Sequence, residues 1–254
     1  MKFDVLTIFP EMFTNVIGSS ILGRAREKGL IDVNLVDFRD YSENKHNKVD
    51  DYPYGGGEGM VIKPEPLFNA LEAMGKTSPP KEKTIYLTAQ GKPYEQKMAS
   101  KYSKLDRIVL ICGHYEEIDE RVRTSLVDEE ISIGDYVLTG GEIPAMVLID
   151  SITRLIPGVL GDENSAVNES FVKGILEHPH YTRPENYRGM KVPDILLSGD
   201  HEAIKKWRFK ESMRRTLKVR PDLLKNLELE EEKREILEEL KREEGLKYTR
   251  RYER

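Results

Sequence analysis

Five short apolar runs, separated by helical patterns, restrict the fold of this chain more than any other feature. The runs are rich in β-branched and aromatic residues, as strands are, and they are Phe3–Phe9, Asp32–Phe38, Thr84–Ala89, Arg107–Gly113 and Glu129–Gly134. The helical patterns between and after them are Ser19–Lys28, Pro64–Met74, Tyr94–Lys104, Ile118–Leu126 and Glu142–Leu155. Several runs are apolar almost without interruption, as expected for strands covered on both faces. The alternation predicts an α/β domain with a largely parallel sheet.

The second half of the chain differs from the first in composition and in its predicted elements. Residues Pro157–Glu169 are polar and contain glycine and proline, which is typical of a linker. A proline-rich stretch follows, and then two helices are predicted at Glu202–Leu217, with Ser198 or Asp200 as its N-cap, and at Glu230–Glu244. The residues expected to form their buried sides are Ile204, Trp207 and Met213 in the first and Ile236, Leu237 and Leu240 in the second. We therefore predict an α/β domain over residues 1–160, a linker over 161–176 and a small helical domain over 177–254.

Composition excludes several classes of protein. No apolar run approaches the ~20 residues needed to span a bilayer, and the first residues lack the apolar core of a secretory signal. Cys112 is the single cysteine, so an internal disulfide is excluded and a reducing, cytoplasmic location is expected. The sequence has no Cys-x-x-Cys and no His-x-x-x-His spacing, so we predict no dedicated metal site.

One segment runs against the overall charge of the chain. Residues Lys205–Lys225 contain nine lysines and arginines and two acidic residues, a local net charge of +7 in a chain whose net charge is −5. A basic segment of this kind is a candidate surface for a polyanion. The alternative is an ordinary solvated helix face.

Three predicted strands end in glycine-rich or turn-forming segments. These are Tyr86–Pro93, Ile111–Arg121 and Ser132–Glu142. Because ligands bind at the carboxyl ends of strands in open parallel sheets, the three segments predict a pocket with many backbone donors and acceptors. None contains a dinucleotide or Walker motif, and a pocket without basic residues suits a neutral or cationic ligand such as an adenosine that carries a sulfonium. The alternative is that the glycines form plain turns.

Two further segments have both a functional and an ordinary interpretation. Asp50–Pro66 is glycine-rich and is either a mobile surface loop or a flap over a large substrate. Ala166–Glu185 gathers Glu169, His178, His180, Tyr181 and Arg183 in a mostly irregular stretch. A carboxylate or an imidazole there could serve as a general base, or these could be ordinary loop residues.

Taken together, these segments resemble one family along almost the whole chain. The matching segments, in chain order, are LTIFPEMF near the start, DDYPYGGGEGM at Asp50–Met60, CGHYEEIDERV at Cys112–Val122, SIGDYVLTGGE at Ser132–Glu142, RLIPGVLG at Arg154–Gly161, and HPHYTRPENYRG and VPDILLSGDH in the second half. The chain resembles the bacterial tRNA (guanine-N1)-methyltransferases of the TrmD family, in the SPOUT superfamily.

The resemblance implies a fold and an activity that the residues alone do not give. It implies a deep trefoil knot, tied by the three strand-end segments, in a SPOUT-type catalytic domain that binds S-adenosylmethionine. It implies transfer of a methyl group to N1 of guanosine 37 of tRNA by a homodimer with shared active sites. The helical domain would then bind tRNA. The family also implies a need for Mg²⁺, whose ligands the sequence does not indicate.

The resemblance also implies roles for particular residues. The positions that fall on the cofactor-binding segments are Tyr86, Leu87, Gly113, Tyr115, Glu116, Ile133, Gly134, Tyr136, Leu138, Gly140, Gly141 and Pro144. Arg154 falls on the catalytic arginine, and Glu169 falls where many members carry an aspartate as general base. The residues expected to contact the substrate are Gly59, His180, Arg183, Lys206, Arg208, Arg214 and Arg215.

Two positions depart from the family pattern. Glu169 replaces the common aspartate and moves the carboxylate by one methylene. Glu117 stands where a glycine is frequent, so it either tunes ligand affinity or faces solvent. Two other functions remain as alternatives: a non-catalytic RNA-binding protein, and a knotted methyltransferase that acts on ribosomal RNA or a 2′-hydroxyl. Retention of Arg154 and Glu169 argues against the first, and the HPHYTRP segment with the helical tail argues against the second.

Overall fold

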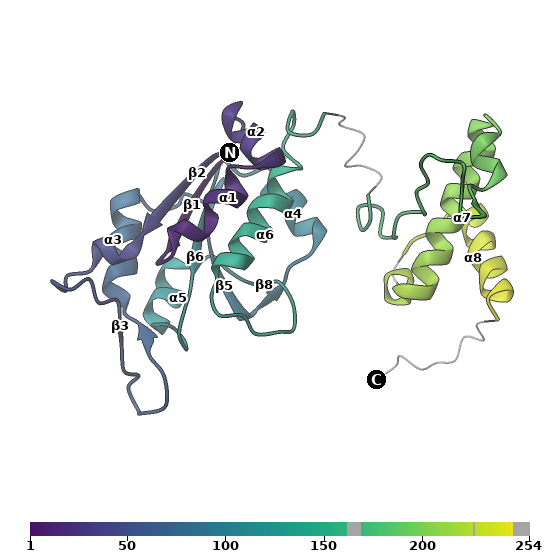
Figure 1. Cartoon of the computed structure of the whole chain (residues 1–254). Helices are drawn as coiled ribbons and strands as arrows, with labels where there is room; N and C mark the ends of the chain where they lie inside the picture. The colour runs from purple at the N-terminus through teal and green to yellow at the C-terminus, as the bar shows by residue number, and fades with distance from the viewer. Residues whose placement is uncertain (162–168, 226, 246–254) are drawn as a thin grey trace. The chain divides into compact units, whose positions relative to one another are not determined.

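A five-stranded sheet organises the first part of the chain in the computed structural model, which describes residues 1–161, 169–225 and 227–245 (Figure 1). The strand order is β2-β1-β6-β5-β8, and every neighbouring pair is parallel. The strands are β1 (Lys2–Thr7), β2 (Asp32–Asp37), β5 (Glu82–Pro93), β6 (Arg107–Cys112) and β8 (Glu129–Ser132). Each overlaps one of the five predicted runs, so the predicted parallel sheet is confirmed.

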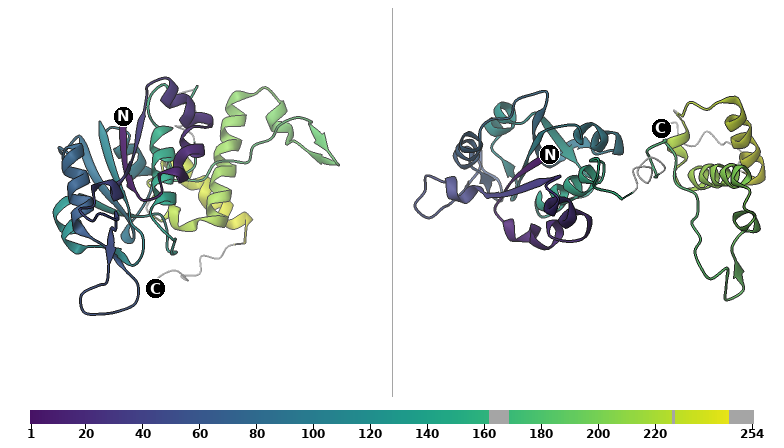
Figure 2. Two further views of the ribbon diagram at one scale, coloured as in Figure 1. Left: turned by 60° about the vertical axis from the view of Figure 1, so that its left-hand side comes forward. Right: turned by 90° about the horizontal axis from the view of Figure 1, so that it is seen from above.

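Helices cover both faces of this sheet (Figures 1 and 2). The helical elements of this part are η1 (Pro10–Phe13), α1 (Thr14–Ile17), α2 (Ser20–Glu27), η2 (Phe38–Tyr41), α3 (Pro64–Met74), α4 (Gln96–Tyr102), α5 (Glu120–Leu126) and α6 (Glu142–Thr153). One core lies between the sheet and α1, α2, α4 and α6, and the other lies between the sheet and α3 and α5. Along β6, Ile108 and Leu110 enter the first core while Val109 and Ile111 enter the second. Burial on both faces explains the uninterrupted apolar runs.

A second, small sheet was not predicted. It joins β3 (Asp50–Asp51), β4 (Val61–Ile62) and β7 (Glu117–Ile118), with β4 antiparallel to β3 and parallel to β7. Strands of two residues are too short to show a periodic pattern, which is why the sequence did not indicate them. The sheet places the glycine-rich loop between β3 and β4 beside the segment that follows β6.

The chain divides into two compact units, residues 1–163 and 164–254. The second contains a hairpin of β9 (Asn186–Tyr187) and β10 (Met190–Lys191), followed by η4 (Asp194–Leu197), α7 (His201–Val219), η5 (Pro221–Leu224) and α8 (Glu231–Glu243). Both predicted helices are present, and the Asp200 side chain caps α7 by accepting a hydrogen bond from the amide of Ala203 at 3.0 Å.

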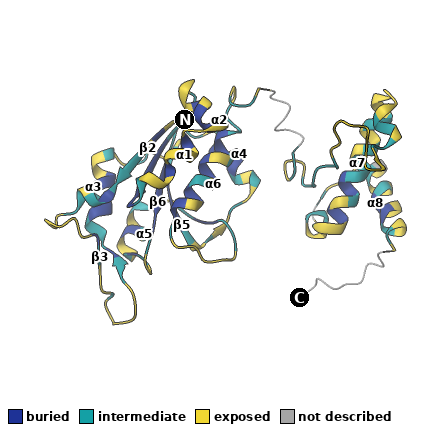
Figure 3. Ribbon diagram, viewed as in Figure 1, coloured by how far each residue is buried: buried dark blue, intermediate teal, exposed yellow. Residues whose placement is uncertain are grey.

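The core of the second unit lies between α7 and α8 (Figure 3). It is formed by Met213 and Leu217 of α7 with Leu237 and Leu240 of α8. Of the predicted buried side of α7, Met213 is fully buried, whereas Ile204 and Trp207 are only half-buried. Neither residue belongs to the core between α7 and α8, so the prediction was wrong about these two residues as core.

The predicted linker at 161–176 falls partly outside the described residues. From Glu169 onward its residues pack into the second unit. The amide of Leu176 donates to the hydroxyl of Thr216 at 2.9 Å, and Ile175 packs against the α7–α8 core. The predicted domain limits, and the knot, remain predictions. Among the described residues, no helix combines the length and apolar character that crossing a bilayer requires.

Candidate cofactor and active site

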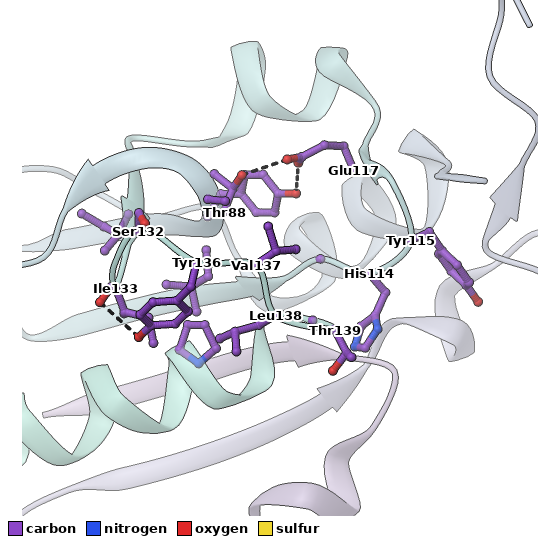
Figure 4. A pocket seen from close by; sticks show the side chains of 18 of the residues that line it. Thr88, His114, Tyr115, Glu117, Ser132, Ile133, Tyr136, Val137, Leu138 and Thr139 are labelled. Carbon is purple, nitrogen blue, oxygen red and sulfur yellow. Dashed lines mark hydrogen bonds between the residues drawn. The ribbon is translucent and has the colours of Figure 1, made fainter. Parts of the chain in front are cut away.

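A cavity of about 190 Å³ lies at the carboxyl edge of the large sheet. Its walls come from the middle of β5, from the segment after β6, from the end of β8 with the segment after it, and from the start of α6 (Figure 4). All twelve residues predicted to bind the cofactor line it. The structure thus brings together residues that lie as far apart in the sequence as Tyr86 and Pro144.

Glycines allow two of these segments to touch. The amide of Gly141 donates to the carbonyl of Gly113 at 2.9 Å, which joins the segment before α6 to the end of β6. A Cβ on Gly141 would lie 2.6 Å from Cα of Cys112. That separation is inside van der Waals contact with backbone, so a side chain here would force the segments apart and open the cavity.

Apolar side chains surround the mouth of the cavity. Tyr136, Val137 and Leu138 follow β8 and are 55%, 89% and 37% exposed. The hydroxyl of Tyr136 donates to the carbonyl of Ile133 at 3.3 Å and so fixes the ring over the segment that carries it. Exposed apolar groups at the rim of a cavity are typical of a site that buries a flat, partly apolar ligand.

A buried polar network supports the floor of the site, and sequence reasoning missed it. Glu142, the first residue of α6, is 1% exposed. One of its carboxylate oxygens accepts a hydrogen bond from the hydroxyl of Thr7 at 2.6 Å, and the other lies 2.6 Å from Nε2 of His114. The network ties β1, the end of β6 and α6 together. Burial, followed by the nearby charge of Glu142, raises the pKa of the Cys112 thiol well above its usual value, which leaves the thiol uncharged.

Glu117 faces the cavity rather than solvent. Its carboxylate accepts hydrogen bonds from the hydroxyl of Tyr86 and from the hydroxyl of Thr88 at 2.8 Å (Figure 4). It also accepts one from the side-chain amide of Gln90 at 3.3 Å. Burial and the bond to Glu117 raise the pKa of Tyr86 far above its ordinary value, so its hydroxyl remains a donor. Of the two alternatives that the sequence left open for Glu117, a role toward the ligand or a position facing solvent, the structure favours the first.

The cavity carries negative charge. Glu116 and Glu117 are both among the described lining residues, and that set contains no lysine or arginine. A cation, or a neutral ligand with hydrogen-bond donors, therefore fits better than a phosphate.

The glycine-rich loop between β3 and β4 lies against the same segment. The amide of Glu116 donates to the carbonyl of Met60 at 3.0 Å. Gly59 has a φ of +80°, and a Cβ there would lie 2.4 Å from a carboxylate oxygen of Glu116. Gly59, predicted to contact the substrate, is thus next to a cavity residue.

The two predicted catalytic residues lie in different units. Arg154 follows directly after α6, where it is the C-cap residue, and belongs to the first unit. Glu169 belongs to the second unit and is half-buried. Since each unit is described by itself, their approach to one another remains a prediction.

A separate cavity of about 430 Å³ lies within the second unit. It brings together three residues predicted to contact the substrate, namely His180, Arg183 and Arg208. The rings of His178 and His180 are 4.5 Å apart, and Nε2 of His180 is 3.5 Å from a carboxylate oxygen of Glu177. Aromatic faces beside guanidinium groups suit an unstacked nucleotide.

The basic segment of α7 is less positive than its sequence indicates. The Arg214 guanidinium forms ion pairs with Glu211, Glu243 and Glu244 at 3.1, 2.9 and 2.7 Å. Lys210 pairs with Glu239 and Glu243, and Lys210 and Arg214 together lower the pKa of Glu243 to about 2. The acidic face of α8 therefore neutralises one side of α7. This geometry argues against the phosphate contact predicted for Arg214, because its donors are already taken up by carboxylates.

The other basic residues predicted on α7 have exposed side chains. Lys206, Arg208 and Arg215 are all exposed to solvent. They are among the basic residues of this segment that remain exposed.

Comparison with known proteins gives the family. The family model described as tRNA (Guanine-1)-methyltransferase TrmD matches residues 1–226. A protein of Anoxybacillus flavithermus named tRNA (guanine-N(1)-)-methyltransferase is 57% identical over 244 residues, covering 96% of this chain and 100% of that protein. Proteins with the same name from Brevibacillus brevis and Shouchella clausii are 58% and 56% identical, covering 96% and 94% of this chain and 99% and 98% of theirs. The chain belongs to the TrmD family of tRNA (guanine-N1)-methyltransferases.

Proposed function

We propose that this enzyme transfers a methyl group from S-adenosylmethionine to N1 of guanosine 37 of tRNA, next to the anticodon. Membership of the family gives the reaction class and implies this donor. The observation that carries the proposal is that all twelve residues expected to hold the donor line one cavity at the carboxyl ends of three strands. Such an edge is where ligands of open α/β sheets bind.

The cavity suits this donor. When bound, S-adenosylmethionine supplies an electrophilic methyl group on a positively charged sulfur. Backbone groups of β5 and of the segments after β6 and β8 would hold the adenine and the bent methionine, and the exposed side chains of Tyr136 and Leu138 would cover the adenine. The carboxylates of Glu116 and Glu117 complement the positive charge.

The chemistry at the guanine assigns one role to each predicted catalytic residue. N1 of guanine carries a proton and becomes nucleophilic only when that proton leaves. We assign the proton transfer to the carboxylate of Glu169, which would accept it as the N1 lone pair attacks the methyl carbon and the carbon–sulfur bond breaks. Negative charge develops on O6, and the guanidinium of Arg154 would stabilise it by hydrogen bonding.

We infer that the site is completed in a homodimer. Glu169 and Arg154 belong to separate units of the chain, so two different copies could supply them to one site. An apolar surface also supports association. Ile143 and Val147 of α6 are 46% and 40% exposed, and η1, which packs against α6, and the adjoining α1 carry Met12 and Val16, which are 42% and 40% exposed. Large exposed apolar side chains grouped in this way mark interaction surfaces.

We further infer that the three segments around the cavity form the trefoil knot of the family, and that the second unit binds tRNA. The contact between Gly141 and Gly113 supports the first inference, because it presses the segment before α6 against the end of β6. The exposed side chains of Lys206, Arg208 and Arg215 support the second. The single buried cysteine keeps the cytoplasm as the expected compartment.

We assign no residues to the binding of Mg²⁺. Within the described ranges, no group of three His, Cys, Asp or Glu side chains is arranged to hold a metal ion. The described residues therefore do not form a magnesium site made of protein side chains alone.

The test is the identity of the methylated nucleoside. The enzyme would be incubated with labelled S-adenosylmethionine and an unmodified tRNA with guanosines at positions 36 and 37, and the RNA would be digested to nucleosides. We expect N1-methylguanosine from this tRNA and none from a transcript with adenosine at position 37. A 2′-O-methyl nucleoside would instead identify a different reaction, and RNA binding without any transfer would identify a binding protein.

A further inference from the structure

The carboxylate of Glu117 is held in one position on the wall of the cavity. It stands on β7, and its three donors come from β5: the hydroxyls of Tyr86 and Thr88 and the side-chain amide of Gln90. All three donors are neutral groups. They orient the carboxylate without cancelling its charge.

The nearby cation does not neutralise this charge directly. Arg123 lies with its guanidinium carbon 6.0 Å from the centre of the Tyr86 ring. Its guanidinium pairs with Glu130 at 2.8 Å and Glu120 at 3.4 Å, and it donates to the side-chain oxygen of Gln90 at 3.4 Å. Among the described residues, no lysine or arginine forms an ion pair with Glu117, and Arg123 attracts its charge only through space.

The carboxylate also keeps room for a ligand. An ionised carboxyl group offers about four acceptor positions on its two oxygens. In Glu117, one oxygen accepts from Tyr86 and the other accepts from Thr88 and Gln90, which occupies three of them. The remaining position, and a charge that no ion pair cancels, are available to a ligand in the cavity that Glu117 lines.

We propose that Glu117 makes this cavity selective for the positively charged methyl donor over its uncharged product, S-adenosylhomocysteine. The inference rests on the proposed placement of the donor in this cavity. Transfer of the methyl group converts the sulfonium to a neutral thioether, so a fixed negative charge stabilises the ligand before the reaction more than after it. Selectivity of this kind favours release of the product and reduces inhibition by it.

The size of the effect follows from Coulomb's law. Two unit charges about 6 Å apart, at an effective dielectric constant of about 40, attract each other enough to change affinity about tenfold. The uncharged sulfur of the product has no such attraction to the carboxylate. The ratio of the two dissociation constants therefore isolates the charge of Glu117 from any general damage to the cavity.

The experiment is calorimetric titration of the full-length protein with S-adenosylmethionine and with S-adenosylhomocysteine. Glu117→Gln keeps the size of the side chain and removes its charge. We expect it to weaken binding of the donor about tenfold and of the product less than about twofold. Glu72→Gln is the matched control, because Glu72 lies on α3, is 57% exposed in its side chain and is absent from the cavity wall. It should leave the ratio unchanged.

A second variant separates charge from packing. Glu117→Asp keeps the charge and shortens the side chain, so it should retain most of the preference for the donor even if both affinities fall. Equal weakening of both ligands by Glu117→Gln, or the same ratio in wild type and Glu117→Gln, would overturn the proposal. Failure of the wild type to bind either ligand would overturn the placement of the donor itself, and the selectivity proposal with it.

Discussion

At the scale of single residues, buried carboxylates with specific partners connect the ends of distant strands. Glu142 is the clearest case, since it joins Thr7, 135 residues away, to His114. Sequence patterns did not reveal this network, because a pairing between residues so far apart leaves no periodic trace. A glutamate at the first position of an apolar helix, preceded by two glycines, was the available signal. Helix N-termini favour acidic residues, so that signal alone indicated an ordinary helix start.

Replacing Glu142 should cost both stability and ligand affinity. Glu142→Ala would leave the hydroxyl of Thr7 and the imidazole of His114 without their partner in a buried site, at about 1–3 kcal/mol for each unsatisfied group. Urea denaturation should show the lower free energy of unfolding. Binding of S-adenosylmethionine should also weaken, because the hydrogen bonds that join β1, the end of β6 and α6 at the cavity are removed. Glu72→Gln, on the surface of α3 with 57% side-chain exposure, is the control and should change stability by less than about 0.5 kcal/mol. Equal stability of the two variants would refute a structural role for the network.

The pKa of Asp4 predicts that part of the folding stability is lost at low pH. Burial by itself would raise its pKa, but hydrogen bonds from Asn34, Arg107 and Lys2 outweigh burial and hold the pKa below 3.8. A depressed folded-state pKa contributes stability above the unfolded-state value of about 3.9, and that contribution is lost as pH falls toward the folded-state pKa.

The matching measurement uses Asp4→Asn. Its free energy of unfolding should fall below that of wild type at pH 7, and the difference should shrink as pH is lowered from about 5 toward 3. A difference that stays constant over this range would show that the charge of Asp4 contributes nothing.

At the scale of elements, the predictable parts of the fold were those with a repeating pattern. The five strands of the large sheet and the helices α2–α8 follow from apolar runs and helical periods that the sequence displays. The strands β3, β4 and β7 hold two residues each and rest on partners elsewhere in the chain. Two-residue strands have no period of their own. The strand-end segments predicted a pocket from the sequence pattern, whereas the roles of individual residues in binding the methyl donor came from the family resemblance.

The packing of α7 on α8 predicts different roles for two neighbouring arginines. Arg214 holds three carboxylates, while Arg215 is exposed. Arg214→Ala should lower the free energy of unfolding of the second unit by about 1 kcal/mol, since surface ion pairs are individually weak. Arg215→Ala should leave stability nearly unchanged. Instead, it should weaken tRNA binding and reduce the slope of log affinity against log salt by about one.

Denaturation and filter binding on the same pair of variants check both expectations. The reverse pattern, with Arg214→Ala weakening RNA binding more than Arg215→Ala, would restore Arg214 to the RNA-contacting set.

At the scale of the whole molecule, the account depends on association of two chains. Val147 on α6 is exposed within an apolar surface. A lysine there would place a charge in the proposed interface, so Val147→Lys should convert dimers to monomers at micromolar concentration and abolish methyl transfer. Light scattering after size-exclusion chromatography measures the mass. Val219→Lys, which changes an exposed valine of α7 in the second unit, is the control and should remain dimeric. Monomeric wild type, or a dimeric and active Val147→Lys, would contradict the shared site.

The central claim is that the chain deprotonates N1 of guanosine 37 with Glu169 while the donor is held at the carboxyl edge of the sheet. Its most direct test is the single-turnover rate of N1-methylguanosine formation by wild type and by Glu169→Ala, with saturating S-adenosylmethionine and tRNA. A general base typically contributes ~10²–10⁴-fold to the rate. The account predicts a loss of at least about 10²-fold in the variant with unchanged affinity for the donor. N1-methylguanosine formed at similar rates by both proteins would contradict it.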